Sequence, residues 1–268
     1  MMIHNKTSCH QWNKRAVCVI ASTLDPAAMT IAKALEDSIS VSYLENKSVL
    51  FSELHDLPAA DDYIILSKHF AASKQPAFTV HSVGNFSNTA ELGGKPLSLG
   101  YANAAIQSSL LHHLYSLCQE KSDFKAFEIT AEATHHGPLL DKPVTFIEMG
   151  SDEEVWNDQK SGSLIAKVVT QFFSQNVDAS YLDLPVAISF GGTHYPKKHT
   201  QQMVDLKFLI GHICPKYAIL QLTEDLVKQM IEKTVPRPKF ALFDKKGTKR
   251  KLEIREWVEK YGLEVLQI

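Results

Sequence analysis

The chain has 268 residues, of which 44% are hydrophobic and 22% are charged, and its formal net charge is -2. This length suits one large domain or two small ones, and a net charge near zero excludes a broad basic surface for nucleic acid. No apolar run approaches the roughly 20 residues that a membrane span needs, and the first residues lack the apolar core of a signal peptide. We therefore expect a cytoplasmic protein without a membrane partner, and we favour a monomer.

Cysteine usage limits the kinds of cross-link and metal site. The four cysteines are widely spaced, with no pair in a Cys-x-x-Cys pattern; they are Cys9, Cys18, Cys118 and Cys214. This spacing predicts neither a disulfide framework nor a zinc site built from cysteine. Any metal ion would have to be held by histidine and carboxylate side chains.

The first third of the chain predicts strands that end in polar residues. Residues 16–21 form an apolar run of the buried-strand type, and Asp25 followed by Pro26 predicts the N-cap and first position of a helix. A second buried strand over residues 63–66 carries Ser67, Lys68 and His69 to its C-terminal end, and a third, over residues 78–81, runs into Gly84 and Asn85. Such strand ends are where α/β sheets hold their sites.

The central part alternates helices and strands. Apolar residues at helical spacing predict a buried helix face over residues 106–118, and strands are expected over residues 127–131 and 144–148. Ser151 and Glu154 fit a capping box that begins another helix.

The last third continues this alternation. We expect strands over residues 186–190 and 216–220, then an amphipathic helix over residues 254–261 that is closed by Gly262 and followed by a short strand. No linker or repeat interrupts the pattern, which predicts a single α/β domain over residues 1–268, a three-layer α/β/α sandwich around a mixed sheet.

The run from Glu132 to Pro138 stands out chemically because it holds a carboxylate and two adjacent histidines before a Gly-Pro turn. Imidazole and carboxylate ligate zinc or move protons near neutral pH, although a histidine pair at a strand end also fits a solvated turn. Neighbouring residues on a regular strand point to opposite faces, so both His135 and His136 can bind one ion only if residues 134–137 leave the strand.

Similar runs of histidine or glutamate beside glycine recur along the chain in one order. They are Ser67-Lys68-His69, Val80 to Asn85, Glu91 to Gly94, Phe146 to Ser151, Gly191 to Tyr195, and Gly211-His212. In this order they resemble the archaeal and plant type of D-aminoacyl-tRNA deacylase, over roughly residues 64–217. The chain departs from that pattern at Thr193, where a third glycine is usual, at Pro196 and at Leu139.

The resemblance implies a fold of the phosphorylase/hydrolase type and hydrolysis of the ester in D-aminoacyl-tRNA. This reaction releases free tRNA and a D-amino acid, which is chiral proofreading and recycles the mischarged tRNA. The resembled family is described as zinc-binding. Zinc with three protein ligands and one open position brings the pKa of its water to about 7 and polarises a carbonyl group.

These considerations assign residues to three roles. The catalytic candidates are His135, Glu132 and His194. The metal candidates are His135, His136 and Glu148, with Glu132, His81 and His194 as further members of the ligand pool. The substrate-binding candidates are Lys68, His69, His81, Asn85, Gly191, Gly192 and His212.

The sequence alone leaves three alternative interpretations of these residues open. Without a metal, a histidine oriented by Glu132 or Glu148 would activate water, while the amides of residues 191–192 or 93–94 would bind the oxyanion. A zinc amidohydrolase or peptidase acting on a small substrate has the same residue types. A catalytically decayed RNA-binding module is the third, favoured only by Thr193.

A tRNA substrate requires a local basic patch on a chain of this net charge. One candidate lies near the C-terminus and comprises Arg237, Lys239, Lys245, Lys246, Lys249, Arg250 and Lys251. A solvated helix face explains the same residues equally well.

Overall fold

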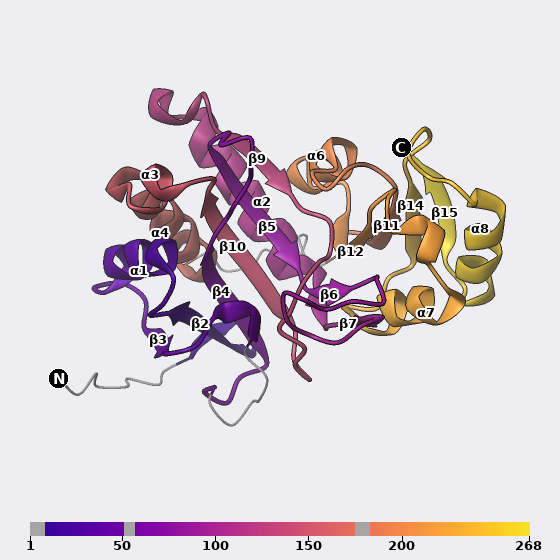
Figure 1. Cartoon of the computed structure of the whole chain (residues 1–268), viewed down its shortest axis with the longest axis horizontal. Coiled ribbons are helices and arrows are strands. Elements are labelled where there is room, and N and C mark those ends of the chain that lie inside the picture. Colours follow the sequence, from indigo (N-terminus) through magenta and orange to yellow (C-terminus); the bar gives the residue numbers. More distant parts are fainter. Residues whose placement is uncertain (1–8, 51–56, 175–182) are drawn as a thin grey trace.

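The computed structural model describes residues 9–50, 57–174 and 183–268, and shows a mixed α/β protein (Figure 1). Its strands are β1 (His10–Trp12), β2 (Arg15–Ser22), β3 (Val41–Leu44), β4 (Asp62–Lys68), β5 (Ala77–Ser82), β6 (Gly84–Asn85), β7 (Ser98–Leu99), β8 (Ala102–Asn103), β9 (Glu128–Ala131), β10 (Val144–Gly150), β11 (Val186–Phe190), β12 (Leu209–Cys214), β13 (Thr234–Val235), β14 (Phe240–Phe243) and β15 (Glu264–Gln267).

Helices connect most of these strands. The α-helices are α1 (Pro26–Leu35), α2 (Ala104–Gln119), α3 (Glu153–Trp156), α4 (Gln159–Ser174), α6 (Lys197–Val204), α7 (Glu224–Glu232) and α8 (Lys251–Lys260), and the 3-10 turns are η1 (Ser48–Leu50), η3 (Ser122–Phe124) and η4 (Ile219–Gln221). As predicted, Asp25 caps α1 by accepting a hydrogen bond from the amide of Ala28, with Pro26 at the first turn.

The larger sheet has seven strands in the order β1-β2-β4-β10-β5-β9, with β3 also paired to β2. It is mixed, because β10 runs parallel to β4 but antiparallel to β5. Alternate residues divide between its two faces. Ile64, Leu66 and Ile147 pack with α1, α2 and α4 in the main core. The other face carries Ile65 and Phe146, whose cluster contains no residue of the described helices.

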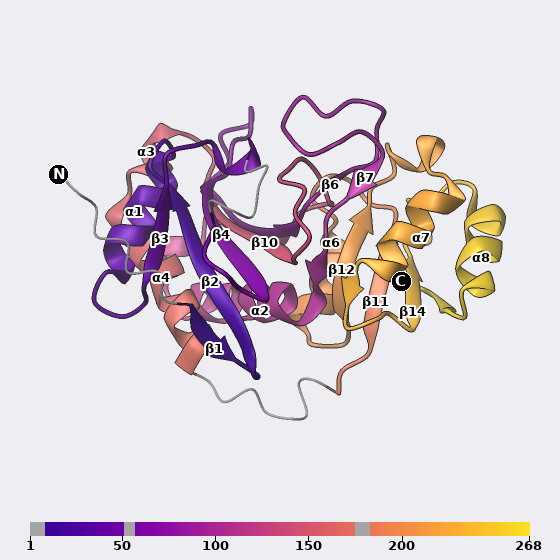
Figure 2. The same cartoon turned by 90° about the horizontal axis from the view of Figure 1, so that it is seen from below.

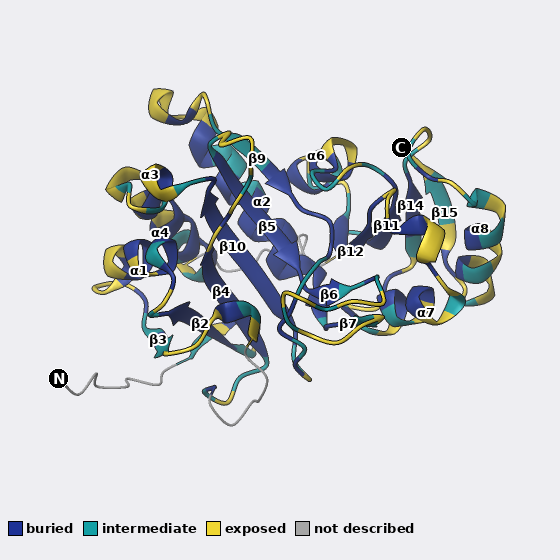
Figure 3. Cartoon of the chain, in the orientation of Figure 1, coloured by how far each residue is buried: buried dark blue, intermediate teal, exposed yellow. Residues whose placement is uncertain are grey.

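The smaller sheet is parallel throughout, in the order β12-β11-β14-β15. One face packs on α7 and α8, and the other packs on α2 and α6. Helix α2 also contacts β5 and β9 of the larger sheet, so it bridges the two sheets. Figure 3 shows that the central strands of both sheets are largely buried, while the outer faces of the helices are exposed. Figure 2 shows the loop between β6 and β7 on the opposite side of the molecule from α2.

Two local predictions are wrong. The expected strand over residues 216–220 is a turn followed by η4, and the strand of this region is β12, just before it. Pro215 ends that strand because it has no amide proton to donate. The capping box also fails, because Asp152 rather than Ser151 accepts the hydrogen bonds of the first amides of α3, and the Ser151 hydroxyl donates to the carbonyl of Gln75.

The expectation of no disulfide is also corrected. Cys9 and Cys18 form a disulfide, with their Cα atoms 4.3 Å apart. Antiparallel pairing of β1 with β2 sets His10 opposite Val17, so the two cysteines occupy the next facing position. Among the described residues, no helix combines the length and apolar character that crossing a lipid bilayer requires.

Candidate active site

The candidate site lies on the face of the larger sheet that the described helices leave uncovered. On β10, Glu148 stands between Ser67 of β4 and Thr79 of β5, two positions along from Phe146 and therefore on the same face. Phe146 is paired with His81 of β5, and the His81 ring stacks on it with centroids 5.1 Å apart. Strand pairing thus brings a histidine and a glutamate together from parts of the chain that are remote in sequence.

The segment that follows β9 contributes the remaining charged groups. Its strand ends at Ala131, and the amide of Glu132 donates to the carbonyl of Val80 on β5. Farther on, His136 has a φ of 44°, a left-handed conformation that a regular strand does not contain. The segment therefore leaves the strand, as binding of one ion by both histidines requires, and the rings of His135 and His136 lie 4.3 Å apart between centroids.

Three histidines are oriented in the same way by backbone carbonyl groups. The Nδ1 atom lies 3.1 Å from the Ser82 carbonyl oxygen in His81, 2.8 Å from that of Ala133 in His135, and 2.5 Å from that of Gly137 in His136. In a neutral ring, an Nδ1–H donated to a carbonyl leaves a lone pair on Nε2, which is the arrangement that metal-binding histidines adopt. Burial by itself lowers the pKa of His81, but Glu148 raises it above its usual value, so His81 gives up a proton when it binds an ion. One ligand nitrogen from each ring can be chosen so that all lie within 4.8 Å of one another.

Two buried glutamates link this histidine group to further residues. Glu132 Oε1 lies 3.2 Å from His69 Nδ1, and Glu132 Oε2 lies 2.8 Å from His194 Nε2 and 3.9 Å from His135 Nε2. Glu148 lies 3.6 Å from His69 Nδ1 and 3.7 Å from His81 Nε2. We call these seven residues the His/Glu cluster: His69, His81, Glu132, His135, His136, Glu148 and His194.

The environment sets different protonation states within the cluster. Burial by itself lowers the pKa of His69, but the carboxylates of Glu132 and Glu148 raise it to about 10. Burial opposes ionisation of both glutamates, yet His194 and His69 hold the pKa of Glu132 well below its usual value, and His69 and His81 lower that of Glu148 to about 2. The glutamates and His69 are therefore charged at neutral pH.

The histidine pair behaves in the opposite way. Burial and the nearby charge of His81 lower the pKa of His135 well below 6.5 and that of His136 to about 4. Both rings are neutral at pH 7, which is the form that binds a metal ion.

These observations bear on whether the cluster fits a metal ion. His81 Nε2 is fully buried and has no hydrogen-bond partner among the described residues, and Glu132 and Glu148 supply oxygen atoms nearby. Nitrogen from histidine and oxygen from carboxylate are zinc ligands. Three overlapping groups qualify: His81, His135 and His136; Glu132, His135 and His194; and His69, Glu132 and Glu148. The cluster can therefore hold a metal ion.

The structure brings together most of the site residues that the sequence pattern predicted. Glu132, His135 and His194 lie in contact, and His136 and Glu148 join the same cluster. His69 and His81, expected to bind substrate, lie in its buried interior.

The other expected substrate-binding residues surround the cluster. Lys68 is exposed, with its ammonium 5.0 Å from the centre of the Trp156 ring, and Asn85 borders a cavity beside His135. Gly191 and Gly192 form the loop before His194. His212 is fully buried behind the site, 3.2 Å from the hydroxyl of Thr134.

Two tyrosines at the cluster were not selected from the sequence. The Tyr195 hydroxyl lies 3.1 Å from His69 Nε2, and the Tyr217 hydroxyl lies 2.9 Å from His194 Nδ1. Tyr195 directly follows His194 in the glycine loop, so the motif itself pointed to it. Tyr217 lies in a segment that was expected to be a strand. Its position in the sequence relative to the histidine and glutamate motifs does not mark it as a site residue.

The glycine loop accommodates the departures at Thr193 and Pro196 that the sequence showed. Gly191 and Gly192 have φ values of 102° and 76°, which favour glycine, whereas Thr193 is not among the residues with positive φ. The Thr193 hydroxyl donates to the Tyr195 carbonyl, and Pro196 stands at the start of α6. A third glycine is therefore not required for this loop conformation.

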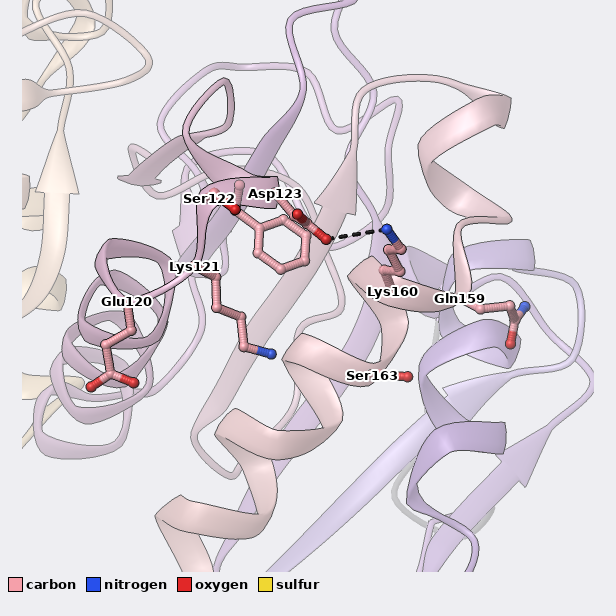
Figure 4. Close-up of a pocket in the computed structure, with 8 residues that line it drawn as sticks. Glu120, Lys121, Ser122, Asp123, Gln159, Lys160 and Ser163 are labelled. Atoms are coloured by element: carbon pink, nitrogen blue, oxygen red, sulfur yellow. Dashed lines mark hydrogen bonds and ion pairs between the residues drawn. The ribbon is translucent and has the colours of Figure 1, made fainter.

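Two cavities of the described surface differ in whether a residue of the cluster borders them. One, of about 160 Å³, is bordered by Asn85, Phe86, His135, Tyr217 and Gln221, among others. A larger one, of about 530 Å³, lies between the end of α2 and the start of α4 and shares no residue with the cluster; there Lys160 pairs with Asp123 at 3.1 Å (Figure 4). Of these two, the first is placed to admit a substrate to the histidines.

Comparison with known proteins extends over most of the chain. The chain is 38% identical to a D-aminoacyl-tRNA deacylase of Ignicoccus hospitalis over 255 residues, which cover 94% of this chain and 99% of that relative. It is 33% identical to one of Methanocaldococcus jannaschii, over 92% of this chain and 97% of that relative. It also matches the crystal structure of a conserved protein of unknown function, AF0625, with a TM-score of 0.85, 25% identity and coverage of 96% of each chain.

A family model gives the same result. The model for D-aminoacyl-tRNA deacylase matches residues 57–266, a range that includes every residue of the His/Glu cluster. The chain therefore belongs to the D-aminoacyl-tRNA deacylase family.

Proposed function

We propose that this protein hydrolyses the ester bond of D-aminoacyl-tRNA and releases free tRNA and a D-amino acid, which is chiral proofreading. The observation that carries the proposal is the common orientation of His81, His135 and His136, whose Nδ1 atoms are bonded to backbone carbonyls and whose rings each offer a ligand nitrogen within 4.8 Å of the others. Glutamates lie beside them in a chain of this family. The aminoacyl ester is already activated, so its hydrolysis needs a positioned water, a proton acceptor and a group that bears charge on the carbonyl oxygen.

We propose zinc as the metal, held by His81, His135 and His136, with Glu148 beside His81. When bound, zinc supplies a water of lowered pKa and polarises the ester carbonyl. This ligand set keeps His135, His136 and Glu148 of the sequence-based assignment near the ion and adds His81, whose buried Nε2 makes no hydrogen bond among the described residues and lies 3.7 Å from Glu148.

The remaining cluster residues act on protons and orientation. Glu132 is ionised and lies within 3.9 Å of His135, so its carboxylate is the proton acceptor toward the attacking water. His194 fixes Glu132 Oε2 through Nε2. His69 is charged and donates from Nε2 to the Tyr195 hydroxyl, which leaves the phenolic proton free to hydrogen-bond the developing oxyanion.

The domain organisation, the fold type, the oligomeric state and the cellular location are proposed on the same basis. We propose that residues 1–268 are one deacylase domain, because a single hydrophobic cluster includes Ile64 of the larger sheet and Leu242 of the smaller one. A three-layer sandwich of the phosphorylase/hydrolase type is supported around the smaller sheet, which has helices on both faces. Action as a monomer in the cytoplasm fits the composition.

The test is hydrolysis of D-Tyr-tRNA and L-Tyr-tRNA by the purified full chain, before and after chelation. We expect turnover of the D form alone, lost on chelation and restored by zinc. Turnover that survives complete metal removal would exclude the zinc assignment and leave a histidine-glutamate base. If neither ester is cleaved by the zinc-loaded protein, the deacylase proposal is wrong, and small amide substrates become the next class to assay.

A further inference from the structure

The cavity of about 160 Å³ beside the cluster contains an aromatic ring that the proposed hydrolysis does not use. Tyr217 borders this cavity, and the residue is 56% exposed although its hydroxyl contacts the cluster. Its hydroxyl lies 2.9 Å from His194 Nδ1, and the two rings are stacked at 23° with centroids 6.4 Å apart. The hydroxyl end of the tyrosine therefore touches the cluster, while more than half of the residue is exposed.

The position of Tyr217 is fixed by the loops around it. The amide of the preceding Lys216 donates to the Gly192 carbonyl, and the amide of Ala218 donates to the Pro215 carbonyl. These bonds tie the turn after β12 to the glycine loop that carries His194. His194 Nε2 faces the Glu132 carboxylate at 2.8 Å and donates to it, so Nδ1 is the ring atom that accepts the proton of the Tyr217 hydroxyl.

The rest of the cavity lining has the chemistry of a base-binding site. Phe86 adds a second aromatic ring, and Asn85 and Gln221 supply amide groups. The Asn85 amide nitrogen donates to the carbonyls of Gly93 and Lys95, which leaves its carbonyl oxygen to accept a hydrogen bond. Stacking on an aromatic ring with amide hydrogen bonds is how proteins recognise unpaired bases, and asparagine and glutamine are the usual partners of adenine.

We propose that this cavity binds the terminal adenine of the aminoacyl-tRNA, stacked on Tyr217, and that the Tyr217 hydroxyl is a positioning group for His194. This inference rests on the proposed deacylase function. Adenine is favoured over the amino-acid side chain because the terminal adenosine is common to all tRNAs, whereas an amide held in place as that of Asn85 is cannot match side chains of varying chemistry. Because His135 borders the same cavity, a base seated there places its ribose ester beside the histidines.

Two substitutions separate the roles of Tyr217. Tyr217→Phe keeps the ring and removes the hydroxyl, so we expect kcat to fall about 3- to 10-fold while KM stays within about twofold. Tyr217→Leu removes the ring as well, so KM should also rise by about 5-fold or more. Tyr261→Leu at the C-terminal end of α8, remote from the cluster, is the matched control and should leave both constants unchanged.

Direct binding measurements make the test independent of turnover. AMP, CMP and free D-tyrosine are titrated into the zinc-loaded full chain and followed by ligand-observed NMR. We expect AMP to bind more tightly than CMP, to be unaffected by D-tyrosine, and to lose at least about 5-fold in affinity in Tyr217→Leu but not in Tyr217→Phe. Equal binding of AMP and CMP, displacement of AMP by D-tyrosine, or unchanged AMP affinity in Tyr217→Leu would each overturn the adenine assignment.

The outcomes distinguish the two proposals. If AMP binding depends on Tyr217 but the chain cleaves neither aminoacyl ester, the adenine site stands and the deacylase function fails. If D-Tyr-tRNA is cleaved but Tyr217→Leu leaves AMP binding and KM unchanged, the function stands and the adenine site is wrong.

Discussion

Glu132 and His194 are separated by 62 residues in the chain, yet Oε2 of the glutamate lies 2.8 Å from Nε2 of the histidine. The same carboxylate contacts His69 through its other oxygen and approaches His135 to 3.9 Å. A single buried carboxylate therefore connects residues from the end of β4, the segment after β9 and the glycine loop. Its charge balances positive charge that would otherwise be uncompensated inside the protein.

The first prediction follows from this central position. Glu132→Gln keeps the shape of the side chain but removes its charge and its ability to accept a proton, so kcat should fall by about 100-fold or more. Single-turnover hydrolysis of D-Tyr-tRNA measures the change. Glu128→Gln, on β9 just before this segment, is the matched control; its carboxylate is partly exposed and pairs with Lys197 at 4.0 Å, and the variant should remain active. Full activity of Glu132→Gln would rule out the proposed base.

Several parts of this site could be predicted from sequence because they depend on local patterns. Short apolar runs predicted β4, β5 and β10, and polar residues at or near their ends marked Lys68, His81 and Glu148. The Gly-Pro turn after the histidine pair indicated that the chain bends there. The motif order also identified the family that the comparisons show.

Other parts depend on long-range pairing and could not be predicted in this way. Nothing local to β10 shows that β4 and β5 are its neighbours, and this order is what brings His81 next to Glu148. Tyr217 was missed because residues 216–220 have the pattern of an apolar strand, whereas the preceding residues 209–214 contain a glycine and a histidine that obscured a buried strand. The Cys9–Cys18 pairing required the register of a hairpin.

The second prediction concerns the metal ligands. Removing a ligand should lower zinc affinity by more than about 100-fold, so His136→Ala, whose own ring is not a proposed proton acceptor, should be isolated with little bound zinc. The measurement is metal content by mass spectrometry after dialysis, with competition against a chromophoric chelator for affinity. His112→Ala on α2 is the control, because its ring bonds to the Val204 carbonyl outside the cluster. Equal zinc content in both variants would remove His136 from the ligand set.

The third prediction is a dependence of stability on pH that arises from a histidine outside the His/Glu cluster. His199 of α6 is fully buried, and burial, only partly opposed by Asp244, lowers its pKa to about 4. In the unfolded chain its pKa is 6.5, so below that pH the unfolded state binds a proton that the folded state does not. Its contribution to the free energy of unfolding therefore falls as the pH drops from 6.5 toward 4, by about 2 kcal/mol at pH 5.

Urea unfolding at pH 7.5 and pH 5 tests this expectation. The loss of stability between the two pH values should be smaller in His199→Gln than in the wild type, because the variant lacks the titrating group. The comparison uses the change with pH within each protein, so a constant packing defect in the variant cancels. Parallel losses in the two proteins would show that His199 does not carry the effect.

The fourth prediction tests the glycine loop. A Cβ atom on Gly191 would lie 2.6 Å from Thr248 Oγ1 and 2.9 Å from Asp244 Cβ, in a backbone with positive φ. Gly191→Ala should therefore displace the loop, lower the free energy of unfolding by about 2 kcal/mol and reduce turnover. Gly262→Ala has a similar positive φ but no atom within 4 Å of the added carbon, so it should cost about 1 kcal/mol and leave turnover intact. Thermal unfolding and kcat give both readouts, and normal turnover by Gly191→Ala would contradict the assignment of this loop to the site.

The final prediction concerns the basic residues near the C-terminus. The structure separates an arginine that is bonded within the protein from lysines that are exposed. Arg250 pairs with Glu253 at 2.6 Å and donates to backbone carbonyls, including that of Ile219. In contrast, Lys245, Lys246 and Lys249 are exposed on the loop that follows β14. We call these three residues the basic loop.

The basic loop lies against the glycine loop of the candidate site. Thr248, between two of its lysines, donates to the Phe190 carbonyl at the end of β11, and Gly247 packs close to the amide of Gly192. Cations on this loop are thus placed near the loop that carries His194, where they can contact phosphates of a bound tRNA.

Replacing all three lysines of the basic loop by alanine should raise KM for D-Tyr-tRNA and leave kcat unchanged, because phosphate contacts position the substrate without acting on the ester. The slope of log affinity against log salt concentration should become shallower by about one for each phosphate that a lysine no longer neutralises. The matched control replaces three exposed lysines outside the cluster, namely Lys121, which lines the hollow between α2 and α4 (Figure 4), Lys125 and Lys167, and should leave KM and the salt slope unchanged. An unchanged KM and salt slope in the basic-loop variant would show that tRNA contacts another surface, and would favour a small substrate if turnover of tRNA esters were also weak.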